Sequence, residues 1–209
     1  MRLVVIVAAL ACAGSAAAAV PYPASPRDAV LLARTPTSEE RLAQSVAARL
    51  TRRPIAVRCA PVAEVPGVLG LTPFVNHRPR GYFLLMPSAC NALERFRAQP
   101  KTYDAVLCRD EACAERLSAM VQALESVSHE SYHTLGFEAE ATAECYGMQS
   151  LWYVASRLGA SQGEAERLAT WYWRYQYPAW RASHPEYWSK ECRDGGALDL
   201  RKDSHAWPS

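Results

Sequence analysis

The sequence predicts an α+β fold in which a small N-terminal antiparallel sheet precedes a predominantly helical C-terminal half. Two observations support this class. Short runs of β-branched and aromatic residues, bounded by Pro and Gly, are found between residues 52 and 87. Beyond them, nearly every segment carries apolar residues three or four positions apart, as amphipathic helices do. The formal net charge is +2 and the basic residues are scattered, so neither nucleic acid nor anionic lipid is expected as a partner.

Residues 1–19 have the layout of a secretory signal peptide. Arg2 precedes an apolar run, and small residues in Ala-x-Ala triplets follow up to Ala19. The apolar run is too short to cross a bilayer, so we expect a secreted protein without a permanent membrane span. Cys12 suggests a lipoprotein, but Ala9 stands where such a site has a larger aliphatic residue, and lipidation is the less favoured expectation.

Residues 20–36 contain four prolines and predict an extended lead-in with little helix. A single domain is expected over 37–209. Its first helix is predicted over 37–53, where Thr37 or Ser38 is the N-cap, acids fill the first turn and basic residues end the last.

Two strands are predicted next. They occupy 52–62 and 80–87, and the Pro- and Gly-rich stretch 66–79 is expected to be an irregular link between them. Helical patterns then follow one another. Gly136 and Gly159 suit the left-handed caps that end two of them, and Ser161 with Glu164 predicts a capping box. The predicted helices cover 87–99, 110–136, 138–159 and 161–176.

An even number of cysteines follows the predicted export signal, which indicates disulfide bonds in an oxidising compartment. The spacing does not choose the pairing, except that Cys108 and Cys113 are near enough to close a small loop. A cysteine zinc site is disfavoured because the chain has no C-x-x-C pair. These cysteines are Cys59, Cys90, Cys108, Cys113, Cys145 and Cys192.

The segment SVSHESYHTLGFEAEATAEC, residues 126–145, is the candidate functional site. His129 and His133 lie four residues apart, so on a helix both imidazoles face one point. Glu130 is turned about 100° from His129, where its carboxylate can act on a water beside an ion. The pattern H-E-x-x-H on a helix is typical of zinc metallopeptidases. The simpler alternative is a solvated helix face.

A catalytic zinc needs a third protein ligand. The break at Gly136 lets the chain fold back across the histidines, and the next helix offers Glu138, Glu140 and Glu144.

The segment resembles the zincin metallopeptidases, in particular gluzincins, in which a glutamate from a following helix joins an H-E-x-x-H helix. That glutamate often lies in a pattern E-x-x-A-[D/N/E], which residues 140–144 fit. The resemblance implies Zn²⁺ held by His129, His133 and Glu140, with Glu144 behind a histidine and Glu138 as the alternative ligand. The segment is also similar to small exported actinobacterial proteins with the pattern E-A-x-A-E-C-Y, which have no assigned substrate.

The resemblance further implies that Glu130 is the catalytic base, that the substrate is a peptide or protein, and that the strand at 80–87 is an exposed edge that pairs with it. The aromatic residues between 171 and 188 are expected to form a core, with a binding groove as the alternative. His77, His184 and His205 are expected at the surface. The alternative functions are a non-catalytic, disulfide-stabilised module that binds carbohydrate or protein, and a metal-retaining inactive zincin scaffold.

Overall fold

The computed structural model describes residues 24–65, 67–104, 108–204 and 207–208. The predicted signal peptide, Cys12 and His205 lie outside these residues. The expectation of an extended lead-in is wrong for its described part, which contains helix α1, Pro26–Ala33. Ser25 caps this helix by accepting a hydrogen bond from the Asp28 N–H. Pro26 occupies the first turn, where a proline loses no helical hydrogen bond, so it starts the helix instead of preventing it.

Helix α2, Ser38–Thr51, begins as its local sequence predicts. Thr37 is the N-cap, and its side chain accepts from the Glu40 N–H while Glu40 accepts from the Thr37 N–H. This reciprocal capping box satisfies two backbone donors that a helix end otherwise leaves unpaired.

The sheet is mixed, which corrects the prediction of an antiparallel one. It has the order β1-β5-β2, where β1 is Ala56–Cys59, β2 is Gly70–Leu71 and β5 is Tyr82–Leu85. Strand β5 runs parallel to β1 and antiparallel to β2. The link at 66–79 is therefore not irregular, because it carries the chain back through β2 before β5 resumes the direction of β1.

The same link also holds the hairpin of β3, Phe74–Val75, and β4, Arg78–Pro79. Asn76 and His77 form its turn with positive φ angles of 52° and 59°. Both residues of such a two-residue turn adopt left-handed conformations.

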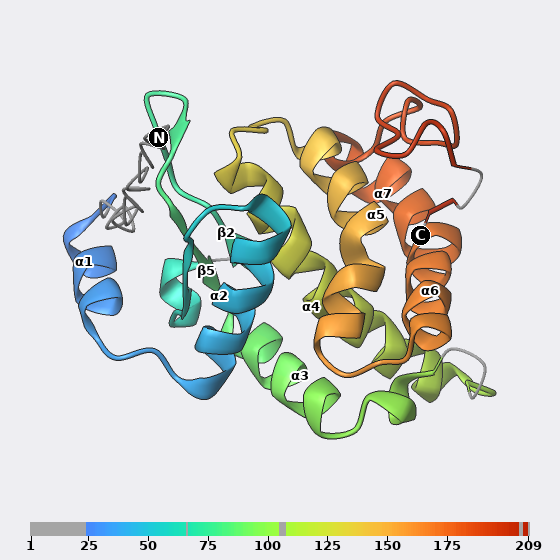
Figure 1. The fold of residues 1–209 in the computed structure, drawn as a ribbon, viewed down its shortest axis with the longest axis horizontal. Helices are drawn as coiled ribbons and strands as arrows, with labels where there is room; N and C mark the ends of the chain where they lie inside the picture. The colour runs from blue at the N-terminus through green and yellow to red at the C-terminus, as the bar shows by residue number, and fades with distance from the viewer. Residues whose placement is uncertain (1–23, 66, 105–107, 205–206, 209) are drawn as a thin grey trace, which may run out of the picture.

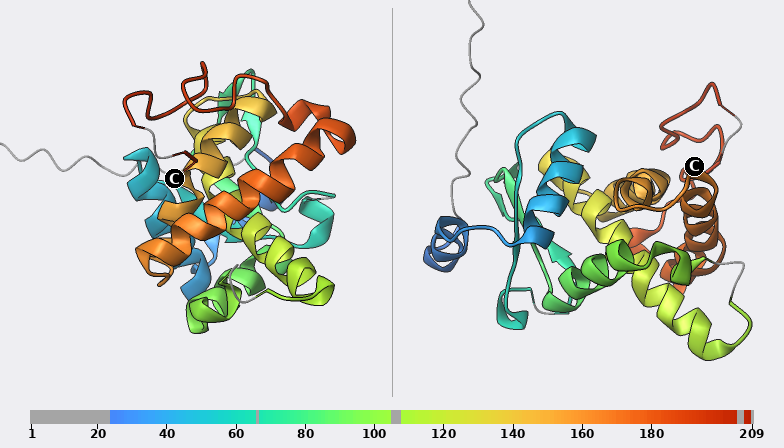
Figure 2. Two further views of the ribbon diagram at one scale, coloured as in Figure 1. Left: turned by 90° about the vertical axis from the view of Figure 1, so that its right-hand side faces the viewer. Right: turned by 60° about the horizontal axis from the view of Figure 1, so that its bottom comes forward.

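All four residues of β5 are buried because both faces of the sheet are covered. Phe83 and Leu85 face the main core, while Tyr82 and Leu84 face a smaller cluster that includes Leu32 of α1. Alternate strand residues point to opposite faces, so a strand covered on both sides is apolar throughout. Figures 1 and 2 show α1 on the outer side of the sheet, away from the other helices.

The helical half stacks on the inner side of the sheet. Figure 1 shows the order sheet, α4, α5 and α6, and α4 contacts both β2 and β5 as well as α5. Helix α4 is the longest of the described helices and lies between the sheet and α5, so the residues of its C-terminal half, 123–134, are buried on every side. The helices are α3, Pro87–Ala98; α4, Glu111–Thr134; α5, Glu140–Arg157; α6, Gln162–Trp171; and α7, Tyr177–Ser183. Shorter helical turns are η1, Val62–Glu64; η2, Pro100–Tyr103; the π-helical η4, Tyr172–Gln176; and η5, Pro185–Tyr187.

Three disulfides join the elements. Cys108 and Cys113 close the small loop before α4. The two longer links are Cys59–Cys90, between β1 and α3, and Cys145–Cys192, between α5 and the C-terminal segment. These bonds are compatible with an extracellular protein. In the described residues, no helix has the length and apolar character needed to cross a bilayer.

Candidate metal centre

Helix α4 brings His129 and His133 together one turn apart. Their Nε2 atoms are 2.9 Å apart, and both side chains are buried. The Nδ1 of His133 contacts the Phe137 carbonyl oxygen at 2.6 Å, which holds that ring by its other nitrogen. The solvated helix face considered from the sequence is therefore excluded for these two histidines.

Glu140 reaches both histidines from the first residue of α5. Its Oε2 lies 3.0 Å from His129 Nε2 and 3.2 Å from His133 Nε2. The chain reverses between α4 and α5 at Gly136, whose φ is +101°, a conformation that favours glycine. Burial raises the pKa of the Glu140 carboxyl, but hydrogen bonds from both histidines outweigh burial and hold it at about 2. One atom from each of these three residues lies within 4.8 Å of the others, so the group could hold a metal ion.

Glu138 lies apart from this group. It is exposed, and its Oε2 is 2.9 Å from Nδ1 of His77 at the tip of the β3–β4 hairpin. His77 is at the surface as expected, and it has a partner that the sequence pattern did not suggest. The structure thus brings Glu140, and not Glu138, to the histidines.

Glu144 lies one turn after Glu140 on α5 and contacts the far side of His129. Its Oε2 is 3.2 Å from His129 Nδ1. Its Oε1 accepts from the Tyr172 hydroxyl at 2.6 Å and the Trp180 indole N–H at 2.9 Å. This contact at Nδ1 holds the His129 ring so that Nε2 points toward Glu140 and His133, which is how carboxylates orient histidine ligands of metals.

Glu130 is fixed by strand β2 and the residue after it. The Thr72 hydroxyl donates to Glu130 Oε2 at 2.7 Å. A Cβ atom at Gly70 would lie 2.6 Å from Glu130 Cγ, so only glycine leaves room for this side chain. Burial raises the pKa of the Glu130 carboxyl. Glu130 therefore lies next to the histidines without belonging to the group of possible ligands.

Glu125 is a site residue that the sequence analysis missed. It precedes His129 by one turn, and its Oε1 lies 3.6 Å from His129 Nδ1. That oxygen is buried and has no hydrogen-bond partner. Burial, with the nearby charge of Glu144, raises the Glu125 pKa to about 8. The four-residue interval between Glu125 and His129 was the signal in the sequence that could have revealed this residue. Its burial could not be read from the sequence, because it depends on α5, where Gly147 leaves space for the Glu125 carboxyl.

These six residues, His129, His133, Glu125, Glu130, Glu140 and Glu144, are called the site cluster below. Its four carboxylates make no ion pair with Lys or Arg among the described residues. Three of them surround His129 and together raise its pKa well above the usual value, although burial alone would lower it. Carboxylates and imidazoles that converge in this way could hold a metal ion, since both are common metal ligands.

Aromatic side chains wall the site cluster on its open side. Two adjoining cavities, of about 310 and 300 Å³, meet at His129, Glu130 and Tyr187. The Tyr187 ring lies 5.7 Å from the His129 ring, measured between centroids. His184 is exposed, as expected, but also lines the larger cavity. The aromatic segment is thus divided. Tyr177 is in the core, Trp180 and Tyr187 line the larger cavity, and the buried Tyr172 does both.

Compared with protein-family models, curated proteins and solved structures, the chain matches none of them. A function for this site has to be argued from its geometry.

Proposed function

We propose that the protein is an exported zinc-dependent hydrolase of zincin type that cleaves peptide bonds. The observation that carries the proposal is the convergence of His129, His133 and Glu140 from two helices, with Glu130 held beside them. Three ligands of this type leave one position of a tetrahedral zinc open, as in catalytic sites, whereas structural zinc sites have four protein ligands. The donor set of two imidazoles and one carboxylate fits zinc, and the convergence of these atoms within 4.8 Å of one another supports a metal there.

Glu130 is the proposed general base. When bound, zinc supplies a Lewis acid that polarises the substrate carbonyl group. Glu130 takes a proton from the attacking water as the new C–O bond forms. It passes that proton to the amine nitrogen as the C–N bond breaks. A carboxylate pKa raised toward neutrality makes this exchange more efficient, and the Thr72 hydrogen bond holds the side chain in place.

Tyr187 is the proposed donor to the substrate oxygen. Burial and the charge of Glu140 raise its pKa to about 12, so the hydroxyl keeps its proton at neutral pH. Its ring lies against His129 at the junction of the two cavities. Tyr187→Phe is expected to lower kcat about 100-fold with KM little changed, the usual cost of losing one such donor. An unchanged kcat would remove Tyr187 from the mechanism.

Strand β2 is the proposed edge for substrate pairing. The sequence pointed to the strand at 80–87, but β5 is the central strand of its sheet and has a neighbour on both sides. Strand β2 is at the edge, and Gly70 contacts Glu130. An extended peptide can add to such an edge through main-chain hydrogen bonds.

Metal analysis of the purified protein tests the proposal. We expect about one zinc per chain, which His133→Ala should abolish. His77→Ala is the matched control, because this exposed histidine pairs with Glu138 and lies outside the ligand group. The metal hypothesis fails if zinc is absent, or if His133→Ala retains it. Zinc without cleavage of a broad peptide library would instead support the inactive scaffold.

A further inference from the structure

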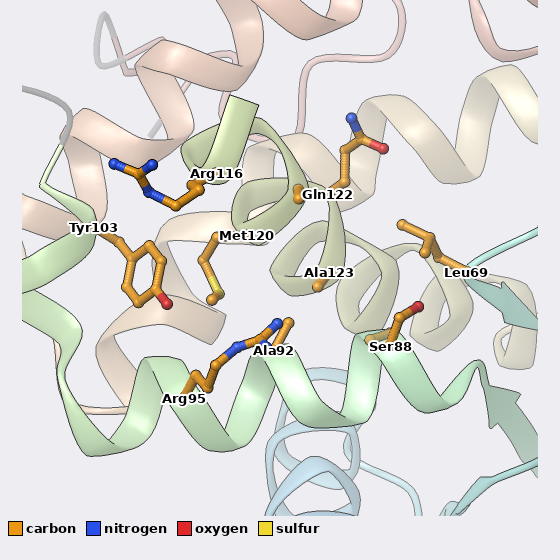
Figure 3. A pocket seen from close by; sticks show the side chains of 11 residues that line it. Leu69, Ser88, Ala92, Arg95, Tyr103, Arg116, Met120, Gln122 and Ala123 are labelled. Atoms are coloured by element: carbon orange, nitrogen blue, oxygen red, sulfur yellow. The ribbon is translucent and has the colours of Figure 1, made fainter. Parts of the chain in front are cut away.

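A separate cavity of about 420 Å³ lies between α3 and α4, and we call it the arginine cavity (Figure 3). Its floor is apolar, formed mainly by Ala92 of α3 and by Met120 and Ala123 of α4. Arg95 and Arg116 lie on opposite sides of Met120. The cavity thus joins an apolar floor to two cationic groups.

The arginine cavity adjoins the larger site cavity. Leu69 and Gln122 line both it and the larger site cavity. Along α4, Arg116 precedes His129 by thirteen positions, which corresponds to about 20 Å of helix. An extended chain covers this span with about six residues. A peptide of ordinary length can therefore occupy both cavities at once.

The two arginines are available to a ligand. Both are exposed, and neither guanidinium group makes an ion pair or hydrogen bond with any described residue. Some other arginines of this chain are paired, as Arg34 is with Glu40 and Arg167 with Asp104. The guanidinium fork matches the geometry of a carboxylate. Because the arginine end is open to solvent, a chain can pass beyond it, which favours an internal side chain over a chain terminus.

We infer that the arginine cavity binds an acidic side chain of the peptide substrate, about six residues from the bond that is cleaved, while the apolar floor takes a neighbouring apolar side chain. The inference rests on the proposed function, since the site cavity provides the other end of the peptide. It assigns a substrate class, acidic peptides, to a surface outside the site cluster.

Peptide binding to the Glu130→Gln protein tests the inference without cleavage. The probes are fluorescein-labelled, C-amidated decapeptides rich in leucine, with one glutamate moved along the chain, each paired with a glutamine version. We expect one glutamate position to bind about tenfold more tightly than its glutamine pair, since each exposed ion pair contributes up to about fivefold. The double change Arg95→Gln and Arg116→Gln should remove the preference, and so should high salt. The control is Arg97→Gln, which changes an exposed arginine of α3, the helix of Arg95. This variant should retain the preference for glutamate.

Each peptide is also tested with a free C-terminal carboxylate. The inference is wrong if the paired peptides bind alike, if the double variant keeps the preference, or if only the free-carboxylate versions bind more tightly. Failure of the inference and failure of the proposed function look different. Wild-type protein that cleaves both peptides at equal rates keeps the function and rejects the inference. Arginine-dependent preference in a protein that holds no zinc rejects the function and keeps the binding site.

Discussion

The Arg34–Glu40 pair beside the sheet and the site cluster between α4 and α5 both contain buried carboxylates, but the partner is an arginine in the first and histidines in the second. Glu40 is fully buried and accepts hydrogen bonds from Arg34, from the Cys59 N–H and from the Thr37 N–H. In the site cluster, the acids meet two histidines and make no ion pair with Lys or Arg among the described residues. A carboxylate paired with arginine is compensated within the fold, whereas acids that converge on histidines form a group that could hold a metal ion.

This difference predicts opposite outcomes when carboxylates are neutralised, and the largest effect is expected at Glu130. Glu130→Gln should lower kcat about 1000-fold, within the range for a lost general base, and should leave the zinc content unchanged. Steady-state kinetics and metal analysis of the same preparation measure both quantities. Activity close to that of the wild type would show that Glu130 is not the base.

Zinc itself should stabilise the protein through the site cluster. At a free zinc concentration one hundred times Kd, the free energy of unfolding should rise by about 2.7 kcal/mol, because the ion binds only the folded state. Urea unfolding with and without a chelator measures the change. His133→Ala should show no such difference, and a difference that persists in this variant would place the ion elsewhere.

Glu40→Gln should lower the free energy of unfolding by about 2 kcal/mol without changing zinc content. The cost is smaller than for a fully buried pair, because the Arg34 side chain is 36% exposed. Burial alone would raise the Glu40 pKa, but hydrogen bonds from Arg34 and two backbone N–H groups lower it below 4.5. Its contribution is thus present above pH 4.5 and is lost as pH falls through the folded-state pKa.

Urea unfolding from pH 6 down to pH 3 checks this sign. The wild type should lose stability over the acid range more steeply than Glu40→Gln. Equal slopes for the two proteins would mean that the Glu40 pair contributes nothing that depends on its charge.

Glu125→Gln should have the smallest effect and the opposite sign. In zinc-free protein it should raise the free energy of unfolding by about 1 kcal/mol, since it removes a buried carboxyl whose Oε1 has no hydrogen-bond partner and whose pKa burial raises to about 8. Urea unfolding in the presence of a chelator measures the free energy of unfolding of Glu125→Gln and, for comparison, of Glu40→Gln. If both substitutions destabilise the zinc-free protein equally, the contrast between the two regions is wrong.

Local signals predicted most of the helical half. Thr37 and Ser161 start helices through capping boxes as expected, because a cap depends on residues three positions apart. The α1 helix was missed because Pro26 was taken as a breaker, although a proline in the first turn favours a helix. Strand direction was missed because the pairing of β1 with β5 depends on the path of the intervening link.

The sequence by itself determined the parts of the site that lie on one helix. His129 and His133 face one point because four residues make about one turn, and Gly136 ends that helix because it tolerates a positive φ. Only the tertiary structure decided which acids join them. Glu140 reaches the histidines, Glu138 turns to His77, and Glu125 becomes buried, because these outcomes depend on how α5 and the β3–β4 hairpin pack against α4. Periodicity along one helix cannot encode such contacts, since they are set by distances between separate elements.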